Sequence, residues 1–76
     1  MQTPAIGARY RHYKNHKDYI ILSIGRWQDD AMPVVVYQGQ YDDPEFGSQP
    51  IWVRSLSDFM AMVDYNGILI PRFTLI

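Results

Sequence analysis

The feature that most constrains this chain is the alternation of apolar and polar residues in short runs. In "DYIILSIGRW", Ile20, Leu22 and Ile24 share one face of an extended backbone, and the residues between them share the other face. "VVVYQGQY" alternates in the same way, and both runs are rich in β-branched residues, which favour strands over helices. Turn-forming segments, "NHKD" and "QDDAMP", separate the runs. The pattern therefore predicts antiparallel strands that are joined by short loops.

About five strands are expected in total. Besides the two runs above, "RYRHYK", "IWVR" and "ILIPRFTLI" have the composition of strands. Pro71 lacks the amide hydrogen that a central strand needs, so the last strand is predicted at a sheet edge or at a bulge. Gly25 is predicted to mark a second bulge. The proline- and glycine-rich segment "DDPEFGSQP" is predicted to be an irregular loop.

One short helix is expected near residues 56–64. Ser55 is suited to cap its first turn, and Phe59, Met62 and Val63 recur at the spacing of one helical face. The Asn–Gly pair at residues 66–67 is expected to close the segment.

Length and composition place these elements in one domain that spans residues 1–76. A chain of 76 residues buries a small core, and the absence of cysteine rules out disulfides as a substitute. The aromatic content of 14% is therefore interpreted first as core material. The fold class that follows is mainly β: a small, strongly bent antiparallel sheet or an SH3-like barrel.

Charge is distributed unevenly although the formal net charge is only −1. Residues 1–26 carry five cations and one acid, a balance of +4, whereas residues 27–76 carry two cations and seven acids, a balance of −5. Such asymmetry can mark a basic face for an anionic partner. The opening segment lacks a cationic start followed by an apolar run, and the apolar runs are too short to span a bilayer. We therefore expect a cytoplasmic domain with no membrane partner.

Four segments in order, "GARYRHYK", "VVYQGQY", "WVRSLSDF" and "PRF", resemble a small bacterial family known as domain of unknown function 1653. The family pattern begins Gly-x-Tyr-x-His-Tyr-Lys, continues with Val-Tyr-Gln and Trp-Val-Arg, and ends in Arg-Phe. Here Gly7 lies one residue further from Tyr10, and Asn15 stands where the family usually has glycine. Since asparagine tolerates the left-handed conformation, the turn is expected to persist. The resemblance covers nearly the whole chain and implies no activity.

Catalysis has little support in the sequence. His12 and His16 lie four residues apart, which is a metal-ligand spacing only on a helix, and the turn-forming "NHKD" segment breaks any helix there. Ser55 and Ser57 are better explained as helix caps than as nucleophiles. We expect no catalytic residue, no metal and no cofactor, and an enzyme is the minority interpretation.

"RYRHYK" raises the main functional question. As a strand it projects Tyr10, His12 and Lys14 to one face and Arg9, Arg11 and Tyr13 to the other. One interpretation is a half-buried edge strand in which His12 has a structural role. The other is a polar and aromatic cleft that the bend of the sheet assembles from His12, Lys14, Tyr37, Gln38, Trp52, Arg54 and Arg72.

Two arginines leave a further choice open. Arg54 and Arg72 each follow a bulky apolar segment, and a guanidinium there can bind a carboxylate or phosphate of a ligand. The alternative is an internal ion pair with Asp58 or Asp64. Trp52 is expected in the core and Trp27 is expected to be exposed.

These observations predict a non-catalytic binding or accessory module for a peptide, a protein partner or a small anionic ligand. The alternative is binding of RNA or single-stranded DNA through Tyr and Trp stacking and Arg and Lys contacts, which the low net charge disfavours. An edge strand and the apolar tail "FTLI" also allow a homodimer.

Overall fold

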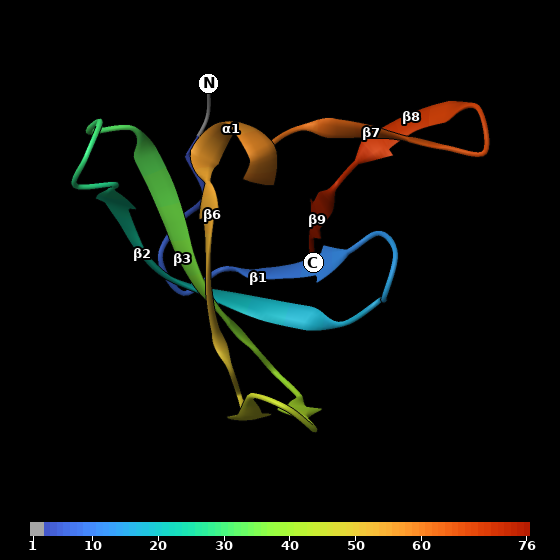
Figure 1. Cartoon of the computed structure of the whole chain (residues 1–76). Coiled ribbons are helices and arrows are strands. Elements are labelled where there is room, and N and C mark those ends of the chain that lie inside the picture. Colours follow the sequence, from blue (N-terminus) through green and yellow to red (C-terminus); the bar gives the residue numbers. More distant parts are fainter. Residues whose placement is uncertain (1–2) are drawn as a thin grey trace.

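The computed structural model describes residues 3–76. Met1 and Gln2 lie outside the described residues; they belong to the opening segment from which a cytoplasmic domain was predicted. The chain is mainly β, with a five-stranded antiparallel sheet in the order β6-β3-β2-β1-β9 (Figure 1). In chain order its strands are β1 (Arg9–His12), β2 (Asp18–Arg26), β3 (Pro33–Gly39), β6 (Ile51–Ser55) and β9 (Phe73–Leu75).

A bulge bends the longest strand pair. The register between β2 and β3 shifts between Ile21 and Ser23, so the prediction of a bulge at Gly25 was wrong; Gly25 pairs regularly with Val34. The bulge has a clear physical reason. Ile21 faces the core, and the extra residue reverses the alternation so that Ile24 packs against the same core. Residues before and after the bulge therefore pack on the same face of the sheet.

The sheet is open. Within residues 3–76 its edge strands β6 and β9 pair with no further strand, so the predicted bent antiparallel sheet is confirmed and the barrel alternative is not formed. The segment "ILIPRFTLI", expected as one strand, forms β8 (Ile68–Pro71) and β9 in two different sheets. The chain turns at Arg72, whose N–H donates to the Ala61 carbonyl and whose carbonyl accepts from the Tyr13 N–H.

The predicted helix begins where expected but is shorter. It is α1 (Leu56–Phe59), and the Ser55 Oγ accepts a hydrogen bond from the Asp58 N–H at 3.1 Å. Met62 and Val63, expected on the helix, instead lie in β7 (Met62–Tyr65), which pairs with β8. The Asn–Gly pair at 66–67 explains this difference, because both residues have positive φ and form the tight turn of a hairpin rather than a helix end.

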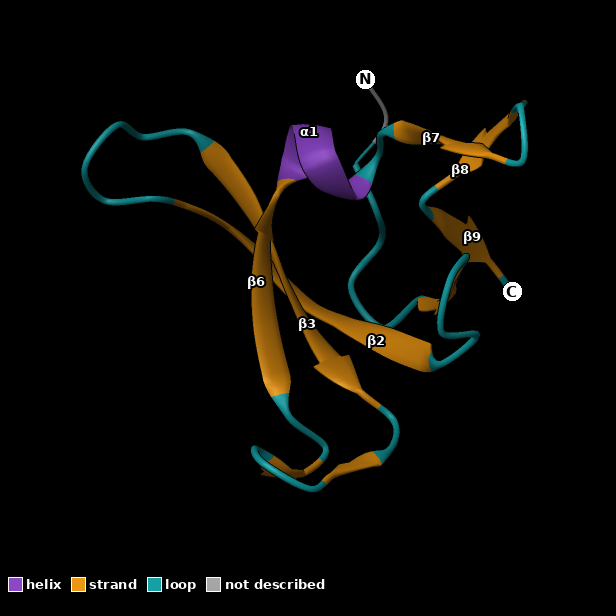
Figure 2. Ribbon diagram, turned by 45° about the vertical axis from the view of Figure 1, so that its right-hand side comes forward, coloured by secondary structure: helices purple, strands orange, loops and turns teal. Residues whose placement is uncertain are grey.

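Two small ribbons lie away from the main sheet. The segment expected as an irregular loop forms a two-residue hairpin of β4 (Asp42–Asp43) and β5 (Gly47–Ser48). Figures 1 and 2 place it beyond one end of β3 and β6, and place the β7–β8 hairpin beside β9 at the opposite end.

The core is aromatic, as the composition predicted. Its buried members are Tyr19, Ile21, Val35, Tyr37, Phe59 and Phe73. The rings of Phe59 and Phe73 are stacked with centroids 4.1 Å apart, and both tyrosines meet Phe73 edge-on. No helix among the described residues has the length and hydrophobicity to cross a membrane.

Candidate functional site

A pocket of about 300 Å³ opens on the concave side of the sheet. Side chains from β1, β2, β3, β6 and β9 and from two turns line it: His12, Asn15, Tyr19, Tyr37, Tyr41, Trp52, Arg54 and Phe73. The pocket is thus built from rings and polar groups and contains no carboxylate.

The β1 strand supplies one wall through its inward face. The Tyr10 ring meets Phe59 edge-on at 5.3 Å, and the His12 ring meets its register partner Phe73 edge-on at 4.9 Å. Arg9 and Arg11 point to the other face, where both contact Asp18. The predicted alternation is therefore confirmed from Arg9 to His12, where β1 ends; Tyr13 and Lys14, which were expected to continue it, lie beyond the strand.

Arg54 is the cation of this pocket. Its Nε donates to the Tyr37 hydroxyl at 3.2 Å, and its Cζ lies 5.8 Å from the centre of the Phe73 ring. No carboxylate among residues 3–76 pairs with it, so of the two possibilities that the sequence left open, the internal ion pair with Asp58 or Asp64 is not formed. Because only Nε is bound, the two terminal nitrogens of a half-buried, oriented guanidinium are left to bind another group.

Arg72 also lacks an ion pair within the described residues. Its Nε donates to the backbone carbonyl of Asp58 at 2.9 Å, which fixes α1 to the start of β9. Its charge nevertheless acts near the pocket, because it is one of the cations that lower the pKa of His12.

His12 is held neutral and in one tautomer. Its Nδ1 accepts a hydrogen bond from the Lys14 N–H at 3.2 Å, so the ring proton lies on Nε2. Burial lowers the pKa of His12, and the charges of Arg54, Arg72 and Lys14 lower it further. His12 therefore presents an N–H donor at neutral pH.

A second group of lining residues is linked by a chain of hydrogen bonds. Asn15 Nδ2 donates to the Tyr19 hydroxyl at 3.1 Å, and that hydroxyl lies 3.3 Å from the Tyr41 hydroxyl. The Trp52 indole N–H donates to the Tyr41 hydroxyl at 3.0 Å. Burial and the Tyr41 hydroxyl raise the pKa of Tyr19 to about 12, so its hydroxyl stays protonated.

The Asn15 side chain has a fixed direction. Its Oδ1 accepts from the Lys17 N–H at 2.8 Å, which leaves Nδ2 facing Tyr19. The left-handed conformation expected for Asn15 occurs instead at His16, with φ of 58°. Asn15 thus contributes to this turn through its side chain.

Gly39 allows Tyr41 to reach the pocket. The Tyr41 ring lies across the backbone of Gly39, and a Cβ at this position would come within 2.7 Å of Tyr41 Cζ. No real Cβ tolerates that contact with a packed ring. The glycine therefore positions the Tyr41 hydroxyl between Tyr19 and Trp52.

Four of the seven residues predicted from the sequence line this pocket: His12, Tyr37, Trp52 and Arg54. Lys14, Gln38 and Arg72 do not line it, and Gln38 Nε2 instead donates to the Gln49 carbonyl at 3.0 Å. The sequence reasoning missed Asn15, Tyr19, Tyr41 and Phe73. The alternation did place Tyr37 and Tyr41 on the same face of "VVVYQGQY", and that was the available signal.

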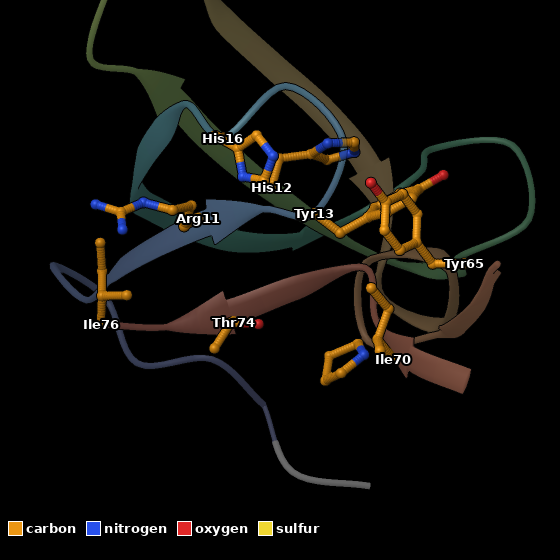
Figure 3. A pocket seen from close by; sticks show the side chains of 9 residues that line it. Arg11, His12, Tyr13, His16, Tyr65, Ile70, Thr74 and Ile76 are labelled. Atoms are coloured by element: carbon orange, nitrogen blue, oxygen red, sulfur yellow. The ribbon is translucent and has the colours of Figure 1, made fainter. Parts of the chain in front are cut away.

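A second hollow, of about 460 Å³, lies between the outer side of β1 and β9 and the β7–β8 hairpin (Figure 3). Tyr13, Tyr65, Ile70 and Ile76 make it mainly apolar. Its one arginine, Arg11, already contacts Asp18 at 2.9 Å. His12 and His16 also line it, so the difference from the first pocket is that the guanidinium of this hollow is already paired with a carboxylate. Among residues 3–76, no three His, Asp or Glu side chains cluster closely enough to hold a metal ion.

Comparison with known proteins agrees on one family. The model of a family described as "Protein of unknown function (DUF1653)" matches residues 8–75. A crystal structure of a DUF1653 protein from Bordetella bronchiseptica is similar, with a TM-score of 0.78 and 28% sequence identity. The match covers 100% of this chain and 87% of that one. No curated protein matches the sequence.

Proposed function

Because the chain belongs to the DUF1653 family, whose function is unknown, we propose a function from its pocket: non-catalytic binding of a small anion at Arg54. The bound group is a carboxylate or a phosphate. The observation that carries the proposal is a half-buried, oriented guanidinium that has no carboxylate partner among residues 3–76.

The geometry of Arg54 supports a two-point contact. A guanidinium binds a carboxylate through two parallel N–H donors, and the tyrosine hydrogen bond to Nε leaves the pair of terminal nitrogens available. The Phe73 ring beneath the guanidinium restricts its movement, so less side-chain entropy is lost on binding.

The other polar groups of the pocket are also donors. Tyr37 accepts from Arg54 and keeps its own hydroxyl hydrogen, and His12 presents its Nε2 hydrogen. An excess of donors over acceptors favours an anionic ligand. The hydroxyls that line the pocket are phenols, and Tyr19 resists ionisation because its pKa is about 12, so they are suited to bind and not to attack.

Binding of RNA or single-stranded DNA has weaker support. A phosphate fits Arg54, but Arg9 and Arg11 both contact Asp18, whose carboxylate offsets one of their two charges and so weakens any basic footprint. A cytoplasmic location is part of the proposal and is consistent with a chain that contains no cysteine.

The test is an NMR titration of the ¹⁵N-labelled domain with acetate, inorganic phosphate, a mononucleotide and a short single-stranded oligonucleotide. We expect saturable shifts of the Trp52 indole and His12 signals with a small anion. Arg54→Met should weaken binding by roughly 10-fold or more, since it removes a charged hydrogen-bond donor. The matched control is Arg26→Met, because Arg26 is exposed and donates to the Ala31 carbonyl in the β2–β3 turn.

Equal affinity of folded Arg54→Met and wild-type protein would disprove the proposal. Binding of the oligonucleotide alone, lost in Arg9→Met and Arg11→Met rather than in Arg54→Met, would replace it with the nucleic-acid alternative.

A further inference from the structure

We infer that the pocket selects carboxylates that carry a second hydrogen-bond acceptor close to the carboxylate, such as 2-oxo acids, and rejects their amino counterparts. This inference rests on the proposed anion site at Arg54 and adds the chemistry of a second group of lining residues. Asn15, Tyr19, Tyr41 and Trp52 form a hydrogen-bonded chain in which the hydrogens can be counted.

The two ends of this chain can only donate. The Trp52 indole has a hydrogen and no acceptor, and Asn15 turns its Nδ2 toward Tyr19 because its Oδ1 is bound to the Lys17 N–H. Each end therefore directs one hydrogen at one tyrosine oxygen. The two tyrosine hydroxyls meet at 3.3 Å, so one of their hydrogens lies between the two oxygens.

One hydroxyl hydrogen is left over. If Tyr19 donates to Tyr41, the Tyr41 hydrogen has no acceptor in the chain; if Tyr41 donates to Tyr19, the Tyr19 hydrogen has none. Either arrangement presents one free O–H donor at the pocket wall. The raised pKa of Tyr19 keeps this hydrogen in place at neutral pH.

The second acceptor of the ligand must be near its carboxylate. The Tyr37 ring, whose hydroxyl accepts from Arg54, lies 5.3 Å from the Tyr19 ring, and the Tyr41 ring lies 5.6 Å from Tyr19. All three tyrosines and Arg54 line the same pocket of about 300 Å³. A compact ligand can therefore reach the guanidinium and the free O–H together.

An ammonium group finds no carboxylate partner in the same place, and each tyrosine oxygen there already accepts one hydrogen bond. The Asn15 oxygen is already bound, the Tyr41 oxygen accepts from Trp52, and the pocket contains no carboxylate. Lys17 Nζ adds positive charge 4.2 Å from the Tyr41 ring centre. A buried donor without an acceptor and next to a cation is disfavoured, so an amine in place of the oxo group should weaken binding.

Three ligands of equal carbon number isolate this step: pyruvate, propionate and alanine. They share a carboxylate and differ in carrying an oxo group, no polar group or an ammonium group at the next carbon. Calorimetry at pH 7 gives the Kd of each ligand. The NMR chemical shift of the Trp52 indole N–H reports contact of the ligand with the hydrogen-bonded chain that includes Tyr41. We expect pyruvate to bind about 5-fold more tightly than propionate, as one added hydrogen bond predicts, and alanine to bind most weakly.

Asn15 provides a matched pair of variants. Asn15→Asp replaces the terminal donor with an acceptor, so Tyr19 can donate to it, Tyr41 can donate to Tyr19, and neither of these two hydroxyl hydrogens remains free. It also keeps the acceptor for the Lys17 N–H. Pyruvate and propionate carry the same charge and should weaken together, and the ratio of their Kd values should fall toward one. Asn15→Ala removes the donor without adding an acceptor, so the preference for pyruvate should persist.

The outcomes separate the two proposals. Equal binding of pyruvate and propionate by the wild type, with both lost in Arg54→Met, would overturn this inference and leave the anion site standing. Binding of alanine as tight as that of pyruvate, or a retained preference in Asn15→Asp, would also overturn it. No binding of any of the three ligands would overturn this inference, and a failure of inorganic phosphate to bind as well would overturn the anion site.

Discussion

The molecule contains two pairs of arginines whose surroundings are opposite. On the outer face of β1, Arg9 and Arg11 both contact Asp18, at 3.3 and 2.9 Å. At the concave side, Arg54 binds a tyrosine hydroxyl and Arg72 binds a backbone carbonyl, and neither pairs with a carboxylate of the described chain. The first pair is exposed and shares one carboxylate, whereas the second has no carboxylate and keeps its charge close to a pocket.

The distribution of charge along the sequence differs from the distribution of unpaired arginines in the structure. The first part of the sequence is basic, yet its two arginines on β1 both contact Asp18, the single acid of that part. Arg54 and Arg72 come from the acidic remainder, where aromatic rings and backbone groups, rather than acids, surround them. A charge count along the chain therefore did not locate the cation of the pocket.

The largest expected change in stability comes from displacing an aromatic ring that lines the pocket around Arg54. In Gly39→Ala the new Cβ meets the Tyr41 ring, so the ring must move and its bonds to Tyr19 and Trp52 are lost. Overpacking of this kind costs about 2 kcal/mol of unfolding free energy. Chemical denaturation measures the loss, and the Trp52 indole N–H signal should shift because its acceptor has gone.

Gly25→Ala is the matched control. A Cβ at Gly25 has only Val34 Cγ2 nearby, at 3.9 Å, which is an ordinary contact. It lies in the same sheet, outside the pocket. If both variants lose the same stability, the loss reflects strand glycines in general and the positioning role of Gly39 is wrong.

Tyr37→Phe is expected to have the next largest effect. It removes the hydroxyl that orients Arg54 and leaves the Nε of that arginine without its protein partner. The expected loss is about 1 kcal/mol of unfolding free energy, the usual contribution of one hydrogen bond, together with weaker anion binding. Tyr65→Phe is the control, since Tyr65 is exposed on the β7–β8 hairpin. Unchanged acetate binding by Tyr37→Phe would show that Arg54 needs no orientation.

The sequence predicted the parts of this site that depend on alternation alone. In β1, a two-residue period separates Arg9 and Arg11 from Tyr10 and His12, and the structure confirms that separation. The bent antiparallel sheet follows from the same period repeated in several runs.

What the sequence did not reveal depends on contacts between distant residues. The bulge near Leu22 was missed because an apolar residue at this position is compatible with either face of the strand. Only packing against the core determines which face the following residues take. Tyr41 was missed because its ring crosses Gly39, a contact that no period encodes. The partners of Arg54 were uncertain because a tyrosine hydroxyl and a carboxylate are both acceptors.

A smaller effect is expected from the pH dependence of His12. Burial, followed by Arg54, Arg72 and Lys14, lowers the pKa of His12 below its ordinary value of about 6.5. Between the folded and unfolded pKa values the unfolded chain binds the proton more readily, so stability is complete above about pH 6.5 and falls as the pH decreases through this window. Denaturation at pH 7.5, 6.5 and 5.5 should show the decrease, and His12→Gln should reduce it.

The two arginine pairs respond differently in this window. Asp18 does not titrate there, because its pKa is lowered by the hydrogen bond from Arg11. An anion bound near His12 should also raise the pKa of His12, so acetate affinity should increase as the pH falls from 7.5 to 5.5. A stability slope that is identical in His12→Gln and the wild type would contradict the role given to His12.

The smallest effect is expected from Asp18→Asn, which releases the outer pair. Exposed ion pairs contribute little to the free energy of unfolding. Asp18→Asn should therefore change stability at pH 7 less than Gly39→Ala, Tyr37→Phe or His12→Gln does. Since the pKa of Asp18 is lowered in the folded state, its contribution exists above the ordinary pKa of about 4 and is lost as the pH falls below it, and wild type and variant should converge in acid. The variant also brings the formal net charge from −1 to 0 and frees Arg9 and Arg11, so weak, salt-sensitive oligonucleotide binding should appear while acetate binding at Arg54 stays unchanged. If acetate binding changed as well, the outer and inner arginines would act as one charged surface, and the contrast between them would have to be abandoned.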